Sequence, residues 1–295
     1  MKLYAYYEVE DARTNATTMK CFSVNEQKHT LGDTSITALG IDLAAEYQNV
    51  IGGKITIPSK YTNGEAIKFI SNFSDTPGIT KVYFLDDAEY IAITESAFDM
   101  AAADSKLTYF EVPSSITHIG KNAFKACHKL VTCDLPNTVV SIGEYAFGAN
   151  STSDTMALVM SELPTNLTAL GAYAFYRCPN VTFSSIPAGI STIKEWTFAS
   201  CNNITINSFG GNGSALTNIS EYAFRTAGAK SVTTLIFDEP LTTIGSKAFK
   251  DGYLGVTNIT THSYFGRASE DAFETELFDD SSRTSSITTN YLPKS

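Results

Sequence analysis

Five cysteines and four histidines are the side chains of this sequence that could ligate a metal or carry redox chemistry. The cysteines, Cys21, Cys127, Cys133, Cys178 and Cys201, are odd in number and contain no C-x-x-C pair, which argues against a disulfide framework and a zinc site. Three of them recur at one position of a repeat, so a redox or metal pair is one interpretation. A ladder of buried thiols is the favoured one, because cysteine packs as a small hydrophobic side chain.

None of the histidines, His29, His118, His128 and His262, stands at a metal-ligand spacing from another histidine, a cysteine or a carboxylate. The sequence contains no nucleophile elbow, phosphate-binding loop or dinucleotide fingerprint. The glycine-rich stretch Gly210-Gly211-Asn212-Gly213 lies between repeat motifs and reads as a turn. We therefore predict no catalytic residue, no metal, no cofactor, and a protein that is not an enzyme.

An aromatic anchor, usually written Ala-Phe, recurs along most of the chain. Its copies, separated by 23 to 28 residues, are Phe98, Phe124, Phe147, Phe175, Phe198, Phe224 and Phe249, with Phe73 and Phe273 beyond them. An aliphatic pair precedes each anchor, as in Ile116-x-x-Ile119-Gly120. An apolar motif follows it, as in Leu107-x-x-Phe110-x-Val112-Pro113. Such recurrence in fixed order indicates an array of structural repeats.

Each motif has a simple physical interpretation. The end of the apolar motif alternates with the period of two that is typical of a short strand with one buried face, and the proline ends the strand pairing. The glycine after the aliphatic pair is expected to permit a tight turn with positive φ. Alanine and phenylalanine supply one small and one large side chain per repeat, which only stacking against neighbouring repeats can bury.

The Leu-x-x-Leu-x-Leu-like strand, the Ile-Gly-x-x-Ala-Phe segment and the cysteine three residues after Phe124, Phe175 and Phe198 resemble the BspA-type (Treponema pallidum-like) leucine-rich repeat. The resemblance covers about residues 51–275. It implies a leucine-rich-repeat solenoid, a right-handed superhelix of short parallel β-strands with turns and short helical or 3-10 segments. It also implies a family of mainly bacterial and protist surface proteins that serve adhesion and partner binding.

The two ends of the chain depart from the repeat. Residues 1–50 are expected to form an N-terminal cap, in which 2–9 and 19–24 read as a β-hairpin. Residues 51–275 hold about nine repeat units. Residues 276–295 are rich in Ser, Thr and Asp and are expected to be a polar C-terminal tail.

Alternate positions of the repeat strands should form columns on the concave face of the solenoid. One column, two residues after the first apolar position, contains large apolar side chains at Tyr109, Met160, Phe183 and Ile206, together with Thr132 and Thr234. If exposed, such a column marks an interaction site; mutual coverage is the alternative. The adjacent column begins with Glu111, Asp134 and Glu162. A cationic partner or solvent screening would relieve the repulsion between these like charges.

Composition limits the partners. A net charge of −10 argues against nucleic acid and anionic membrane surfaces. No apolar run approaches the ~18 residues that would span a bilayer, so membrane insertion is not expected. The N-terminus does not read as a secretory signal.

We therefore expect a non-enzymatic protein-binding or adhesion module of a bacterial surface protein. It would bind a protein or peptide with basic and aromatic groups through its concave strand face, at the cell surface or after secretion. The alternative is a structural or attachment component of a phage virion or surface assembly, located in the virion or the cytoplasm. An enzyme with a site in the loops finds no supporting group of residues.

Overall fold

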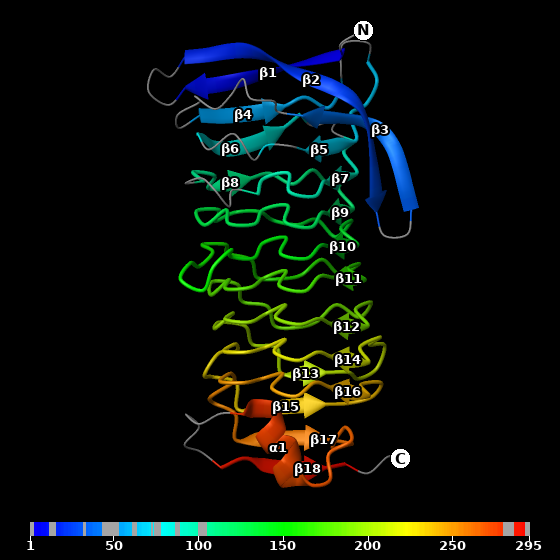
Figure 1. Cartoon of the computed structure of the whole chain (residues 1–295), viewed down its shortest axis with the longest axis vertical. Helices are drawn as coiled ribbons and strands as arrows, with labels where there is room; N and C mark the ends of the chain where they lie inside the picture. The colour runs from blue at the N-terminus through cyan, green and yellow to red at the C-terminus, as the bar shows by residue number, and fades with distance from the viewer. Residues whose placement is uncertain are drawn as a thin grey trace.

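The computed structural model describes residues 3–11, 16–31, 34–42, 53–60, 64–71, 73, 78–85, 89–99, 105–279 and 286–292, the first three ranges by their backbone alone. The chain winds into stacked coils that form an elongated β-solenoid of about eight turns with little helix (Figure 1). We call each turn a rung. This architecture confirms the predicted leucine-rich-repeat solenoid.

One ladder of short parallel strands passes through the aliphatic pair that precedes each anchor. Its strands are β5 (Phe69–Ser71), β7 (Ala92–Ile93), β9 (His118–Ile119), β10 (Ser141–Ile142), β11 (Ala169–Leu170), β12 (Thr192–Ile193), β14 (Asn218–Ile219) and β16 (Thr243–Ile244). Residues such as Ile119, Ile142 and Leu170 point into the core. Strand hydrogen bonding is interrupted once in this ladder, between β11 and β12.

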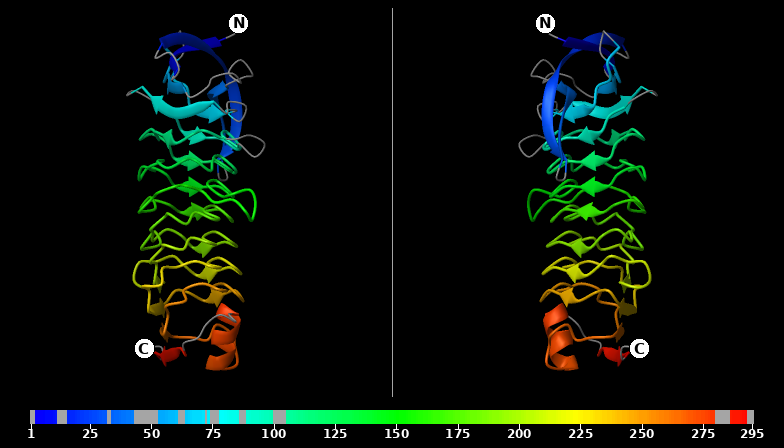
Figure 2. Two further views of the ribbon diagram at one scale, coloured as in Figure 1. Left: turned by 90° about the vertical axis from the view of Figure 1, so that its left-hand side faces the viewer. Right: turned by 90° about the vertical axis from the view of Figure 1, so that its right-hand side faces the viewer.

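A second ladder follows the apolar motif after each anchor. Its strands are β4 (Gly53–Ile57), β6 (Ile79–Phe84), β8 (Tyr109–Phe110), β13 (Ser208–Phe209), β15 (Thr234–Phe237), β17 (Asn258–Thr261) and β18 (Thr288–Tyr291). The rungs between β8 and β13 are joined less regularly, by the bridge between Tyr109 and Thr132 and by single bonds such as that from Val159 N to Val131 O, 2.9 Å. Within each ladder the paired strands are parallel, and both ladders run along the length of the solenoid (Figure 2).

A meander of three antiparallel strands lies at the N-terminal end. It consists of β1 (Leu3–Asp11), β2 (Ala16–Leu31) and β3 (Thr34–Asp42). Strand β1 pairs with β4 of one ladder, and β3 pairs with β5 of the other. The meander thereby joins the two ladders into one eleven-stranded sheet.

The C-terminal end is built differently. Helix α1 (Glu270–Phe278) begins at Ser269, whose side chain accepts a hydrogen bond from Ala272 N, and it buries Phe273, Leu277 and Phe278. The segment 276–295 was expected to be a polar tail; it contains the end of this helix and β18, which pairs in parallel with β17. Strand β18 is the edge of its sheet.

The core is organised around the anchor phenylalanines. Their rings stack without interruption from Phe73 to Phe249; for example, the centroids of Phe98 and Phe124 are 5.2 Å apart with 7° between the ring planes. Beyond Phe249, Phe278 of α1 continues the column with a tilted ring, 6.2 Å away. Each ring therefore gains contact area from both neighbouring rungs.

The glycine that follows the aliphatic pair has a different role from the one expected. Positive φ was predicted there, but it occurs two residues later, for example at Asn122 (56°) after Gly120 and at Tyr173 (57°) after Gly171. At Gly120 a Cβ would lie 2.5 Å from the backbone nitrogen of Glu95 in the preceding rung, so there is no room for a side chain there. Close approach of successive rungs, and not turn geometry, explains this residue.

Candidate interaction surface

The predicted apolar column is exposed only in part. Tyr109 is partly exposed, and its ring lies 5.1 Å from that of Tyr83. By contrast, Met160 is 4% exposed, and Phe183 and Ile206 are 0% exposed. The expectation that these three side chains face solvent is wrong, so they cannot contact a partner while the chain is folded.

A change of strand register explains the error. In the early rungs the buried positions are three residues apart, as in Leu107 and Phe110, and the residue between them that was assigned to the column stays outside. In the next three rungs they are two residues apart, as in Leu158 and Met160, and the exposed residue is Val159, at 52%. Alternation with a period of two places Met160 on the core face.

The predicted acidic column lies at the surface. Glu111 is half-buried and accepts a hydrogen bond from Phe84 N, 2.9 Å, so it helps to end β6. Asp134 and Glu162 are exposed. Burial, together with Glu111, Tyr83 and Asp134, raises the pKa of Tyr109. A binding role for these residues stays a prediction.

A different row of side chains forms the most distinctive surface of the described chain. In consecutive rungs, the residue two positions before the anchor phenylalanine is Tyr145, Tyr173, Trp196 and Tyr222; we call this row the aromatic file. Centroids are 4.4 Å apart for Tyr145 and Tyr173, 5.8 Å for Tyr173 and Trp196, and 4.9 Å for Trp196 and Tyr222. All four residues are partly exposed to solvent.

Cationic side chains lie over the aromatic file near its ends. Lys125 Nζ is 5.7 Å from the Tyr145 ring, and the Arg225 guanidinium is 5.2 Å from the Trp196 ring. Burial, the neighbouring Tyr173 and a hydrogen bond to it raise the pKa of Tyr145 to about 12. Tyr145 is therefore a neutral hydrogen-bonding group at physiological pH.

Every residue of the aromatic file has a left-handed backbone, with φ between 53° at Tyr145 and 58° at Tyr222. Ser96, Asn122 and Lys247 take the same conformation in other rungs. Since this region suits asparagine far better than bulky side chains, the aromatic residues are not what the backbone itself favours. The strain, about 1–3 kcal/mol per residue, is offset in part by ring stacking.

Carboxylates lie beside the aromatic file. Glu144, Glu195 and Glu221 each directly precede one of its residues. Glu144 pairs with Lys121, 3.1 Å away, whereas Glu195 and Glu221 form no ion pair within the part of the chain that the structure describes. The negative charges of Glu195 and Glu144 contribute to raising the pKa of Tyr173, after burial. The surface thus combines partly exposed aromatic side chains with carboxylates that form no ion pair among the described residues.

The cysteines of the repeat form the predicted ladder of buried thiols. The Sγ atoms of Cys127, Cys178 and Cys201 donate to the carbonyl oxygens of Phe98, Phe147 and Phe175, at 3.2, 3.3 and 3.1 Å. Each bond links one rung to the preceding one. Burial raises the pKa of Cys127 and of Cys201 to about 12, so both thiols are protonated and unreactive at neutral pH.

The described residues show neither a cluster of metal ligands nor a membrane-spanning helix. Over the residues with a described position, no three or more His, Cys, Asp or Glu side chains gather closely enough to hold a metal ion. Within the same ranges, no helix has the length and apolar character needed to cross a bilayer.

The chain matches the pattern of the BspA-type leucine-rich repeat region in six copies, over residues 69–205 and 148–278. No curated protein gives a match. Among solved structures, a leucine-rich repeat protein from Bacteroides ovatus is similar at 18% identity, with 82% of this chain and 70% of that chain covered and a TM-score of 0.48.

Two further solved structures are similar. A leucine-rich repeat protein of Treponema pallidum shares 18% identity, with 73% of this chain and 90% of that chain covered and a TM-score of 0.35. The pneumococcal vaccine antigen PcpA shares 13% identity, with 92% and 97% covered and a TM-score of 0.36.

Proposed function

The chain belongs to the BspA-type leucine-rich repeat proteins, and from this we propose that it is a non-enzymatic module that captures a protein or peptide ligand. Solenoids of this kind typically act as scaffolds, because stacked repeats place equivalent side chains in long rows that a partner can follow. Family membership also supports adhesion at the surface of a bacterial cell, or after secretion, as the setting of this binding.

The aromatic file is the observation that carries the proposal. Its residues occupy a strained backbone conformation in consecutive rungs, where serine, asparagine or lysine stands in other rungs. Stacking accounts for contact between the rings, but it leaves the side chains partly exposed. Tyrosine and tryptophan at such positions are the residue types that contribute most to protein interfaces.

The chemistry beside the file defines the ligand. Glu195 and Glu221 carry negative charge next to Trp196 and Tyr222, and the whole chain carries a net charge of −10. An extended segment with arginine or lysine can pair with these carboxylates and hydrogen bond to the tyrosine hydroxyls. We therefore assign the ligand as a polypeptide segment that bears basic and aromatic side chains.

The test uses short random peptides displayed on phage, selected for binding to the whole chain. Selected peptides should be rich in arginine, lysine and aromatic residues. Trp196 is the only tryptophan, so its fluorescence reports directly on the file. Titration with a selected synthetic peptide should change Trp196 emission to saturation.

The decisive variant is Tyr173→Asn combined with Tyr222→Asn. Asparagine suits the left-handed backbone at both positions, so the solenoid should fold while the file loses its tyrosines. This variant should bind selected peptides at least about tenfold more weakly, a loss of ~1.4 kcal/mol. Tyr109→Thr is the matched control in the predicted strand column; if it abolished binding and the double variant did not, the aromatic file would be excluded.

A further inference from the structure

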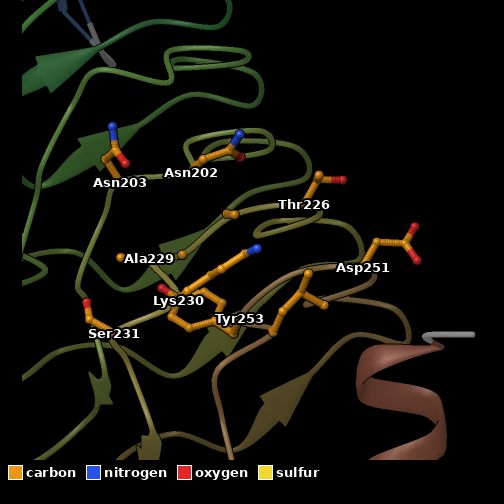
Figure 3. A pocket seen from close by; sticks show the side chains of 11 residues that line it. Asn202, Asn203, Thr226, Ala229, Lys230, Ser231, Asp251 and Tyr253 are labelled. Atoms are coloured by element: carbon orange, nitrogen blue, oxygen red, sulfur yellow. The ribbon is translucent and has the colours of Figure 1, made fainter. Parts of the chain in front are cut away.

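We propose that a cavity in the turns of the later rungs binds a neutral sugar ring, at a site separate from the aromatic file. The cavity has a volume of about 440 Å³ and is lined by residues 202–203, 226–231, 251 and 253–254. Figure 3 shows Asn202 and Asn203 along one side, Thr226 and Asp251 along the other, and the Lys230 side chain extending between them. Its size falls in the range of small-molecule sites.

Two extra residues create the cavity. In two earlier rungs the apolar motif begins six residues after the anchor, at Val181 after Phe175 and at Ile204 after Phe198. In this rung it begins eight residues after the anchor, at Val232 after Phe224. The longer turn contains Gly228 and Ala229, and Ala227 occupies the place where Cys178 and Cys201 stand in the two preceding rungs. The buried ring of Tyr253, from the following rung, lies under this turn.

Backbone bonds to both neighbouring rungs hold the cavity open in one shape. Gly228 N donates to Cys201 O at 3.1 Å, and Ala229 N donates to Ile204 O at 2.8 Å. From the other side, Tyr253 N donates to Ala227 O at 2.7 Å, and the Tyr253 hydroxyl donates to Ile206 O at 2.8 Å.

Glycines allow this close packing. A Cβ on Gly228 would lie 2.7 Å from the Tyr253 ring, and one on Gly255 would lie 2.0 Å from Lys230 O. The position of Lys230 is therefore fixed by its backbone while its side chain stays exposed. A site whose walls are already ordered loses little conformational entropy when a ligand binds.

The lining chemistry matches hydroxyl groups. Among the described residues, the side-chain polar groups of Asn202, Asn203 and Lys230 have no hydrogen-bonding partner. Each amide both donates and accepts, as a sugar hydroxyl does. Thr226 and Asp251 add acceptors on the opposite side.

Charge and shape favour a neutral pyranose over an ionic ligand. Lys230 and Asp251 give the lining one positive and one negative side chain, so a ligand of either sign would meet a like charge. Leu254, 39% exposed, supplies an apolar contact for the C–H face of the ring. A zwitterionic amino acid is the competing occupant, and the experiment separates the two.

The experiment is a titration of the isotope-labelled whole chain, followed by amide NMR. The probes are the methyl glycosides of glucose, galactose, mannose and N-acetylglucosamine, and free alanine as the zwitterion. At least one glycoside should shift the amide signals of Gly228, Ala229 and Gly252 to saturation in the millimolar range that is typical of single sugars in open sites.

The variant is Asn203→Ala combined with Lys230→Met. Both positions are exposed, so the fold should be unchanged and amide chemical shifts away from the two positions should stay the same. It should bind the same glycoside at least about tenfold more weakly. Lys129→Met, an exposed lysine in an earlier turn, is the matched control and should bind as the unaltered chain does. The proposal is overturned if no glycoside saturates these signals, if the double variant binds equally well, or if alanine alone binds.

Discussion

Gly171 lies so close to Glu144 of the preceding rung that a Cβ added to Gly171 would come within 2.3 Å of the Glu144 backbone nitrogen. The same relationship joins Gly143 to Lys121, at 2.5 Å, and Gly245 to Glu221, at 2.4 Å. Backbone meets backbone at these points, so neither side can move aside as a flexible side chain would. The distance between rungs is therefore set in part by residues without a side chain.

Gly171→Ala should lower the free energy of unfolding by about 1–3 kcal/mol or more, because the added methyl group pushes two packed rungs apart. Ser220 occupies the equivalent position in another rung and already carries a Cβ. Ser220→Ala is thus the matched control and should stay within about 0.5 kcal/mol of the unaltered chain. Urea unfolding followed by circular dichroism measures both, and equal stability of the two variants would contradict the steric explanation.

Phe175→Ala should be among the most destabilising substitutions in the chain. Its ring is 0% exposed and is stacked between Phe147, at 5.5 Å, and Phe198, at 5.9 Å. The loss should be about 3–5 kcal/mol, because a cavity opens in the middle of the column. Tyr291→Ala, at a 50% exposed position, is the comparison and should cost little in the same denaturant experiment.

The buried cysteines should make stability depend on alkaline pH. Burial raises the pKa of Cys201 from 9.0 to about 12, so the folded chain keeps a proton that the unfolded chain loses. The free energy of unfolding should therefore be level below about pH 9 and fall as the pH rises from 9.0 towards 12. Each such thiol contributes a slope of about 1.4 kcal/mol per pH unit in that window.

Cys201→Ala removes one of these slopes and is compared with the unaltered chain by urea unfolding at several pH values. The variant loses the bond to Phe175 O and is less stable at neutral pH, but its stability should fall less steeply above pH 9. Identical slopes for the two proteins would show that this thiol does not stay protonated in the folded state.

Arg225→Gln should alter the fluorescence of Trp196 without disturbing the core. The guanidinium lies 5.2 Å from the Trp196 ring and 5.8 Å from that of Tyr222. Loss of these contacts should cost about 0.5–1 kcal/mol and shift the emission of the only tryptophan. Lys129→Gln, an exposed lysine away from the file, should change neither quantity.

The repeat array could be predicted because its signal is redundant. The anchor phenylalanines recur with alanine before them, and a single departure such as Thr197-Phe198 does not hide the period. The surface was harder to predict because it depends on register. Buried positions are three residues apart in Leu107–Phe110 but two residues apart in Leu158–Met160. This difference of one residue moves a side chain from solvent into the core, and composition does not signal it.

The aromatic file was missed although its signal is present in the sequence. The residue before Ala-Phe or Thr-Phe is aromatic in Glu144-Tyr145, Glu195-Trp196 and Glu221-Tyr222. Nothing in periodicity alone indicates that this position is left-handed and half-exposed, because that follows from how each turn packs on the next rung. The cavity beside Lys230 likewise depends on two inserted residues whose effect only the neighbouring rungs define.

The N-terminal meander gives the two ends of the column different resistance to force. Strands β1 and β3 tie both ladders together, so the first rungs cannot separate without breaking strand pairing in both ladders at once. At the other end, within the described chain, β18 pairs with one strand alone. A load applied through the termini should therefore peel the solenoid from β18 inward, one rung at a time, while the end beneath the meander yields last.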